Sequence, residues 1–255
     1  MDTKYVLSEL LGIMRRAVEV LRSESPLEIS AKAQGDFVTS IDYSIENFLI
    51  GELGKILPEA GVISEESSPR RRDINWFIDP IDGTGNMIYG FPFAVSVALA
   101  DAGNEAIMGA IYDASRDVIF YAVRGEGAFV QAYQKEPERI LIGDHSRSEG
   151  LCIFGMPYDR NKAHRILSIA EKLYTISSDL KRIGPSSLDI CAVAEGRAKI
   201  YAELDLKEWD YKAGGLILQE AGGKIGGFDD LLIFCESESV MRQVIDLLDL
   251  GKTDS

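Results

Sequence analysis

Apolar residues recur every three or four positions in the first part of the chain, which is the spacing that places them on one face of a helix. This pattern predicts an amphipathic helix over residues 3–22, with a structural role. A second helix should begin after Thr39 or Ser40, either of which can cap it, and should extend to Ile56. Between the two, residues 31–38 favour a loop or hairpin.

The middle of the chain alternates short apolar runs with turn residues. The runs at 93–100, 106–112, 118–123 and 127–131 predict four strands in an antiparallel meander. Beyond Glu136-Pro137, strands alternate with helices, which suggests a second α/β half. Strands are expected at 151–155, 198–204 and 231–235, and helices at 161–174, from Ser186 or Ser187 to Gly196, at 211–221 and at 237–250. We therefore expect one unit, 1–255, with subregions 1–136 and 137–255.

The stretch from Asn75 to Asn86 combines these patterns with acidic side chains. Trp76-Phe77-Ile78 is a strand-like run, and Asp79-Pro80 is expected to end it. Asp82 follows three residues later, directly before Gly83-Thr84-Gly85. If this glycine-rich turn opens a helical turn, its free N–H groups would suit a phosphate.

Two carboxylates so close in sequence imply a nearby cation. At a separation of about 4 Å they would repel by roughly 4 kcal/mol at an effective dielectric of 20. Oxygen ligands favour Mg²⁺, Mn²⁺ or Ca²⁺ over zinc. Taken alone, an Asp-Pro pair is more often only the end of a buried strand, with the second acid capping a helix.

Composition narrows the range of functions. The formal charge of −14 argues against nucleic acid as a partner, and 46% apolar residues suffice for a substantial core. The three cysteines lie in apolar surroundings without metal-like spacing, as core thiols in a reducing compartment would. The two histidines fit no nucleophile pattern. Without a signal core or an apolar run near 18 residues, we expect a soluble cytoplasmic protein with no membrane partner.

The string Asp79-Pro80-Ile81-Asp82-Gly83-Thr84 resembles the signature of the inositol monophosphatase family, within the lithium-sensitive, magnesium-dependent sugar phosphatases. Two further motifs of that family occur in the same order. Ser64-Glu65-Glu66-Ser67 lies upstream, and Trp209-Asp210 lies downstream, so the match extends over about residues 32–223. The resemblance implies an α+β or α/β fold, a five-layer helix–sheet–helix–sheet–helix sandwich, and commonly a homodimer.

The resemblance also implies a metal site and a water-activating group. It assigns two or three Mg²⁺ ions, which Mn²⁺ could replace, to Glu65, Asp79, the Ile81 carbonyl, Asp82 and Asp210. Thr84, supported by Asp42, and Glu65 would activate the attacking water, and Lys32 would steady the same region. By pattern alone, Asp42 would be only a dipole partner at a helix start, Glu65 a solvated loop residue and Asp210 a helix cap.

The expected substrate is a small phosphorylated metabolite. Asp82, Gly83 and Thr84 would hold its phosphate, and Glu203 matches a position that contacts substrate hydroxyls. Compact, archaeal-type members are similar to dual inositol monophosphatases and fructose bisphosphatases, so inositol 1-phosphate and fructose 1,6-bisphosphate are expected. The candidates for the substrate wall and for a second phosphate are Lys181, Arg182, Ser186, Tyr158 and Arg160.

Several alternatives remain open at this point. The bases of the substrate wall could equally form a solvated surface, and Pro185 departs from the residue found in many inositol monophosphatases. Adenosine 3′,5′-bisphosphate and NADP are further candidate substrates. A phosphosugar- or metal-sensing regulator is the non-enzyme alternative, although Glu65, Thr84 and Asp42 would be dispensable for metal binding alone.

Overall fold

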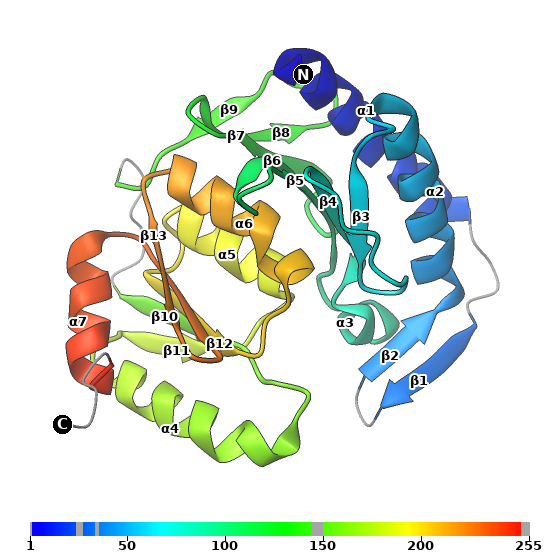
Figure 1. The fold of residues 1–255 in the computed structure, drawn as a ribbon. Coiled ribbons are helices and arrows are strands. Elements are labelled where there is room, and N and C mark those ends of the chain that lie inside the picture. The colour runs from blue at the N-terminus through cyan, green and yellow to red at the C-terminus, as the bar shows by residue number, and fades with distance from the viewer. Residues whose placement is uncertain (1, 24–27, 34–35, 144–149, 251–255) are drawn as a thin grey trace.

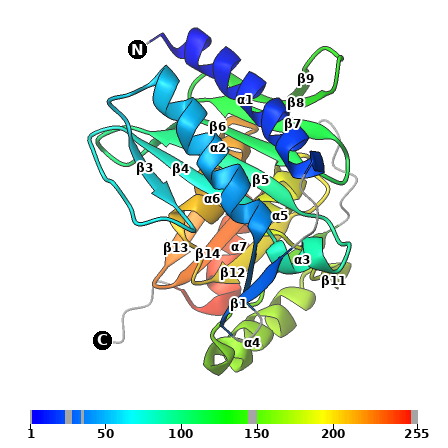
Figure 2. The same cartoon turned by 90° about the vertical axis from the view of Figure 1, so that its right-hand side faces the viewer.

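Two large sheets separate three layers of helices in the computed structural model, which describes residues 2–23, 28–33, 36–143 and 150–250 (Figure 1). One outer layer holds α1 (Thr3–Ser23) and α2 (Ser40–Ile56), which lie side by side in Figure 2. The middle layer holds α5 (Ser186–Ala194) and α6 (Glu208–Glu220), and the other outer layer holds α4 (Ala163–Tyr174) and α7 (Glu238–Leu248). The expected helix–sheet–helix–sheet–helix sandwich is thus confirmed.

The larger sheet contains the predicted meander. Its strand order is β3-β4-β5-β6-β7-β8-β9, and only the β3–β4 pair is parallel. The strands are β3 (Gly61–Ser64), β4 (Asn75–Asp82), β5 (Ala94–Ala100), β6 (Ala106–Asp113), β7 (Val118–Val123), β8 (Gly127–Ala132) and β9 (Glu138–Ile140). The short strand β9 was not predicted, because only one of its three residues is buried and apolar.

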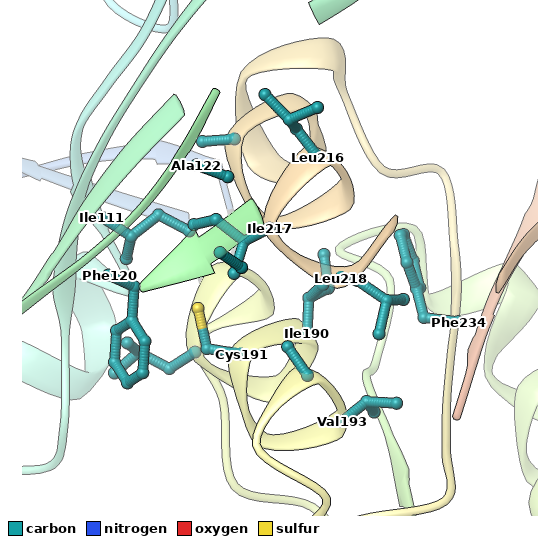
Figure 3. Close-up of a cluster of buried hydrophobic side chains, with 14 of the residues drawn as sticks. Ile111, Phe120, Ala122, Ile190, Cys191, Val193, Leu216, Ile217, Leu218 and Phe234 are labelled. Carbon is teal, nitrogen blue, oxygen red and sulfur yellow. The ribbon is translucent and has the colours of Figure 1, made fainter. Parts of the chain in front are cut away.

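Strict alternation along these strands fills the two faces of the larger sheet. Trp76 and Ile78 join the apolar cluster formed with α1 and α2, whereas Phe77, between them, joins the cluster around α5 and α6. Phe120 and Ala122 of β7 contribute to the second cluster in the same way, as Figure 3 shows.

The second sheet has the order β11-β10-β12-β14-β13 and is mixed. Its strands are β10 (Leu151–Phe154), β11 (Asp179–Lys181), β12 (Ile200–Leu204), β13 (Lys224–Phe228) and β14 (Leu231–Cys235). Tyr201 and Phe234 on its inner face stack with ring centroids 5.5 Å apart and belong to the same apolar cluster as Phe77. One continuous core therefore joins the two halves of the chain through the middle helices.

The sequence pattern misplaced several boundaries. β4 does not end at Asp79-Pro80 but continues to Asp82, with an irregular register against β5 between Asp79 and Asp82. The helix predicted over 211–221 begins at Glu208, so Asp210 lies in its first turn and Lys207 is the cap residue. β13 was missed because its two adjacent glycines interrupt the apolar pattern.

Smaller elements complete the fold. Residues 31–33 and 36–38 of the expected loop or hairpin lie in an antiparallel pair of strands, β1 (Ile29–Ala33) and β2 (Asp36–Thr39), and α3 (Thr84–Ile88) follows β4. A 3₁₀ turn, η1 (Arg160–Lys162), precedes α4. All three cysteines are buried and free, as expected. Among the described helices, none has the length and apolarity needed to cross a membrane.

Candidate active site

A cavity of about 870 Å³ lies where the end of β4 faces the second half of the chain. Most of the residues singled out from the sequence line it. From the first half these are Glu65, Asp79, Ile81, Asp82, Gly83 and Thr84, and from the second half Arg182, Ser186, Glu203 and Asp210. The fold therefore brings together motifs that are far apart in the chain.

The turn after β4 has a backbone conformation that suits glycine. Gly83 adopts φ 87° and ψ 45°, in the left-handed region, and it immediately precedes α3. A side chain there would also be crowded, because a Cβ atom would lie 3.0 Å from Cβ of Pro185. This turn places Thr84 on the cavity wall directly behind Asp82.

Thr84 is joined to Asp42 as the resemblance implied. Its hydroxyl oxygen lies 2.9 Å from Asp42 Oδ1 and 3.1 Å from the Ile81 carbonyl oxygen, and it can donate to either. Asp42 is fully buried, and its other oxygen, Oδ2, accepts from the backbone N–H of Thr39 at 2.8 Å and from its hydroxyl at 2.5 Å. Thr39 thus caps α2 through the same carboxylate that holds Thr84. The sequence pattern had suggested Thr39 only as a possible cap.

Asp82 is held from the second half of the chain. Its Oδ2 accepts from the backbone N–H of Ser187, in the first turn of α5, at 2.7 Å. Asp82 is 7% exposed and Asp79 is 2% exposed. The larger sheet and the middle helix layer therefore meet at Asp82.

The acids of the site raise one another's pKa values. Burial is the first cause for Asp79, whose pKa lies well above its usual value, and Glu65 and Asp82 add to the effect. Burial likewise raises the pKa of Asp82 to about 6, although hydrogen bonds from Ser187 act against it. For Asp210, burial and then Asp82 place the pKa well above the usual value. Ionising all of these buried carboxyl groups in the absence of a cation is therefore unfavourable.

These residues fit a hard divalent cation. Asp79 Oδ1 is buried and has no hydrogen-bond partner among the described residues, so it is a free oxygen donor in an acidic site. In the described ranges, no three acidic, histidine or cysteine side chains are already drawn together as metal ligands.

Glu203 lies on the opposite wall within a network that the sequence did not reveal. Its Oε2 accepts from the Ser186 hydroxyl at 3.3 Å and from the Tyr201 hydroxyl. Tyr201 and Glu203 are two residues apart on β12 and share a face, which is the signal that could have found this pair. A Cβ atom on Gly155 would lie 1.9 Å from Glu203 Oε2, so glycine is needed for the carboxylate to fit.

The candidates for a second phosphate are divided by the structure. Arg182 and Tyr158 line the cavity, whereas neither Lys181 nor Arg160 is among the described lining residues. Lys181 forms an ion pair with Asp179 instead. Lys32 lies in β1, but its side chain is outside the described part of the chain.

Aromatic side chains at the cavity were missed in the sequence. Phe37, Tyr89 and Phe91 line it together with Tyr158. Tyr89, Phe91 and Tyr158 are 62–70% exposed, which is high for large apolar rings. Tyr89 and Phe91 lie between α3 and β5, outside any periodic pattern, so the sequence gave no signal for them, whereas Tyr158 was already a candidate for the second phosphate.

Comparisons with known proteins show relatives in sequence and in structure. The chain is 36% identical over 209 residues to the Nus factor SuhB of Salmonella typhimurium, covering 79% of this chain and 76% of that protein. The solved structure of an IMPase from Thermotoga maritima has a TM-score of 0.82 and 25% identity, covering 98% of this chain and 97% of the other. A structure described as an IMPase/NADP phosphatase complexed with Mg²⁺ and phosphate shares the fold, with a TM-score of 0.75, 21% identity and coverage of 99% and 95%.

The family comparison covers nearly the whole chain. The model of the inositol monophosphatase family matches residues 2–240, which include the end of β4, the loop with Glu65, and α6 with Asp210. The chain belongs to the inositol monophosphatase family.

Proposed function

We propose that this protein is a Mg²⁺-dependent phosphatase that hydrolyses a small sugar or inositol phosphate. The observation that carries the proposal is the hydrogen bond between Thr84 and the buried Asp42, beside the carboxylates of β4. Metal binding alone would not need a hydroxyl held by a buried acid. Family membership and the similarity to a solved IMPase support the same function.

The acids of the cavity would hold the cations. In this proposal Glu65, Asp79 and the Ile81 carbonyl bind one Mg²⁺, and Asp79, Asp82 and Asp210 bind a second. The bound ions would supply a nucleophile at neutral pH and stabilise negative charge on the leaving oxygen. The relative complexed with Mg²⁺ and phosphate supports this choice of cation.

The protein's own groups would position the water and the phosphate. Thr84 can accept a hydrogen bond from the attacking water while its hydroxyl donates to Asp42 Oδ1 at 2.9 Å. The backbone N–H groups of Gly83 and Thr84 would bind phosphate oxygens. As the water oxygen bonds to phosphorus, the water would pass one proton through the Thr84 hydroxyl to the Asp42 carboxylate. The phosphorus–oxygen ester bond would break, the leaving alkoxide would take a proton from solvent, and Asp42 would return its proton to solvent. Glu203, fixed by Tyr201, would accept from a substrate hydroxyl.

Phosphate release tests this function. We would compare kcat/KM for inositol 1-phosphate, fructose 1,6-bisphosphate, adenosine 3′,5′-bisphosphate and NADP, with Mg²⁺ and with a chelator. Activity on the first two substrates should require Mg²⁺ and fall by a factor of about 10² or more in Asp82→Asn, since this change removes a proposed ligand. Absence of Asp82-dependent activity on all four esters would overturn the proposal.

A nucleotide phosphatase is the second candidate. The exposed rings of Tyr89, Phe91 and Tyr158 at the cavity could stack on a nucleotide base. The related structure described as an IMPase/NADP phosphatase favours the same class. A preference for adenosine 3′,5′-bisphosphate or NADP in the same assay would select this candidate and leave the metal chemistry unchanged.

A regulator without catalysis is the remaining alternative, because a relative of the chain is named a Nus factor. Mg²⁺ binding without phosphate release from any of the four esters would favour it. We also expect a homodimer in solution, by resemblance to the family, and sedimentation velocity would test that expectation.

A further inference from the structure

Loop 65–72 follows β3 and contains Glu65. Backbone hydrogen bonds attach it to the larger sheet near both of its ends. Val62 and Arg70 exchange two backbone hydrogen bonds, at 3.0 Å and 2.7 Å. The Glu65 N–H donates to the carbonyl of Ile78 at 3.2 Å, immediately before Asp79. The backbone alone therefore fixes where the loop begins and ends.

A buried acid on α2 holds the middle of this loop. The Ser67 hydroxyl donates to Glu46 Oε2 at 2.8 Å. Glu46 is 2% exposed and lies one helical turn after Asp42, and its Oε1 has no hydrogen-bond partner among the described residues. Burying such a carboxylate costs stability, whereas the nearby buried positions of α2 hold apolar residues such as Ile45 and Leu49. Packing alone therefore does not account for an acid at this position.

A second acid, on α6, holds the far end of the loop. Arg71 pairs with Glu208 Oε2 at 2.6 Å, and Glu208 lies two residues before Asp210 in the first turn of α6. Glu208 Oε1 also accepts from Asn104 Nδ2 at 2.6 Å, which orients the carboxylate. The loop is thus linked to the element that carries Asp210.

We propose that Glu46 and Glu208 are positioning residues that clasp loop 65–72 between α2 and α6. The clasp fixes Glu65 relative to Asp79 and Asp210. This inference rests on the proposed function, in which Glu65 and Asp79 share a Mg²⁺. Ligands from three separate elements need such support, because a site that is about 1 Å too loose loses its function. Neither acid contacts the reacting atoms.

Mg²⁺ affinity, measured by titration calorimetry without substrate, tests the clasp. Ser67→Ala should raise the Mg²⁺ dissociation constant about tenfold, and Arg71→Ala about threefold, since the second pair is more exposed. The matched controls, Ser68→Ala and Arg70→Ala, change exposed neighbours and should stay within about twofold. Ser67→Thr and Arg71→Lys should restore the affinity. At saturating Mg²⁺ the phosphatase rate of the alanine variants should recover, which a general loss of folding would not allow.

Amide hydrogen exchange of the metal-free protein gives a second reading. In Ser67→Ala and Arg71→Ala, the Glu65 amide should exchange about tenfold faster than in the two controls. Equal exchange in all four variants would overturn the clasp. Faster exchange with unchanged Mg²⁺ affinity would also overturn it, because the loop would then not position a ligand. If the unmodified protein bound no Mg²⁺, the metal assignment of the proposed function would fail, while exchange would still decide whether the clasp exists.

Discussion

Thr84 and Asp42 are 42 positions apart in sequence, yet the Thr84 hydroxyl oxygen lies 2.9 Å from Asp42 Oδ1. The other oxygen of Asp42 is taken by the N–H and hydroxyl of Thr39 at the start of α2. One carboxylate therefore both caps a helix and orients a hydroxyl at the cavity. Its hydrogen bonds fix the direction in which the Thr84 lone pairs face the site.

Removing that hydroxyl should abolish most of the activity. Thr84→Ala is expected to lower kcat/KM by about 10²- to 10⁴-fold, the range associated with a positioned proton-transfer group. Thr84→Ser should retain most of the activity because it keeps the oxygen. Phosphate release at saturating Mg²⁺ measures both.

Asp42→Asn combined with Thr84→Ala should lower kcat/KM no more than the stronger of the two single changes, because the two residues act as a unit. Full activity in Thr84→Ala would exclude the hydroxyl from the mechanism.

Adding one methyl group at Gly155 should weaken substrate binding. The new Cβ would lie 1.9 Å from Glu203 Oε2, so the carboxylate must move away from its partners. We expect Gly155→Ala to raise KM about tenfold with little change in kcat, as for the loss of a contact made equally in the ground and transition states. Gly54→Ala is a matched control, since a Cβ there meets nothing within 4 Å. An unchanged KM would mean that Glu203 does not contact the substrate.

Stabilisation by Mg²⁺ should depend on pH. Burial raises the pKa of Asp82 to about 6 in the folded, metal-free protein, above the value of about 3.9 in an unfolded chain. Between these two values the folded state binds more protons, so its stability falls as the pH rises through this window. Mg²⁺ should replace those protons and restore the stability of the folded state at pH values above this window. The Mg²⁺-induced rise in Tm should therefore be larger near pH 8 than near pH 5, and equal shifts in a calorimetric scan at both would contradict this linkage.

Arg182 should distinguish a bisphosphate from a monophosphate. It lines the cavity, and loss of a charged hydrogen bond costs about 1.5–3 kcal/mol. Arg182→Ala should thus lower kcat/KM for fructose 1,6-bisphosphate by roughly 10- to 100-fold, and by much less for inositol 1-phosphate. Lys181→Ala serves as the control, since Lys181 pairs with Asp179. Equal losses on both substrates would remove the second-phosphate role.

Periodicity predicted the helices and the meander because burial on one face imposes it directly. Periodicity failed where strand pairing, and not the burial of one face, determines the backbone structure. The Asp79-Pro80 pair was expected to end a strand, but the irregular register between Asp79 and Asp82 accommodates a residue without an N–H group. β13 lies at the edge of its sheet and contains two glycines, so its pairing with β14, and not its own composition, makes it a strand.

For the site, the resemblance to a family predicted more than the local sequence pattern did. Glu65, Asp79, Asp82 and Asp210, which the resemblance had selected, line one cavity. Pattern alone would have left Asp42 and Asp210 as helix-start residues. The supporting contacts were not predictable. The approach of Gly155 to Glu203 depends on the pairing of β10 with β12, and the Ser187 N–H reaches Asp82 only when the two halves pack together; no local pattern encodes either contact.

The placement of α6 between the two sheets has a consequence for synthesis. Phe77 and Phe120 belong to the face of the larger sheet that Ile217 of α6 helps to cover. Because translation proceeds from the N-terminus, the ribosome makes this sheet well before the helix that shields it. The nascent chain therefore carries an uncovered apolar surface for much of its elongation, and in that interval it should be prone to aggregation and a candidate for chaperone binding.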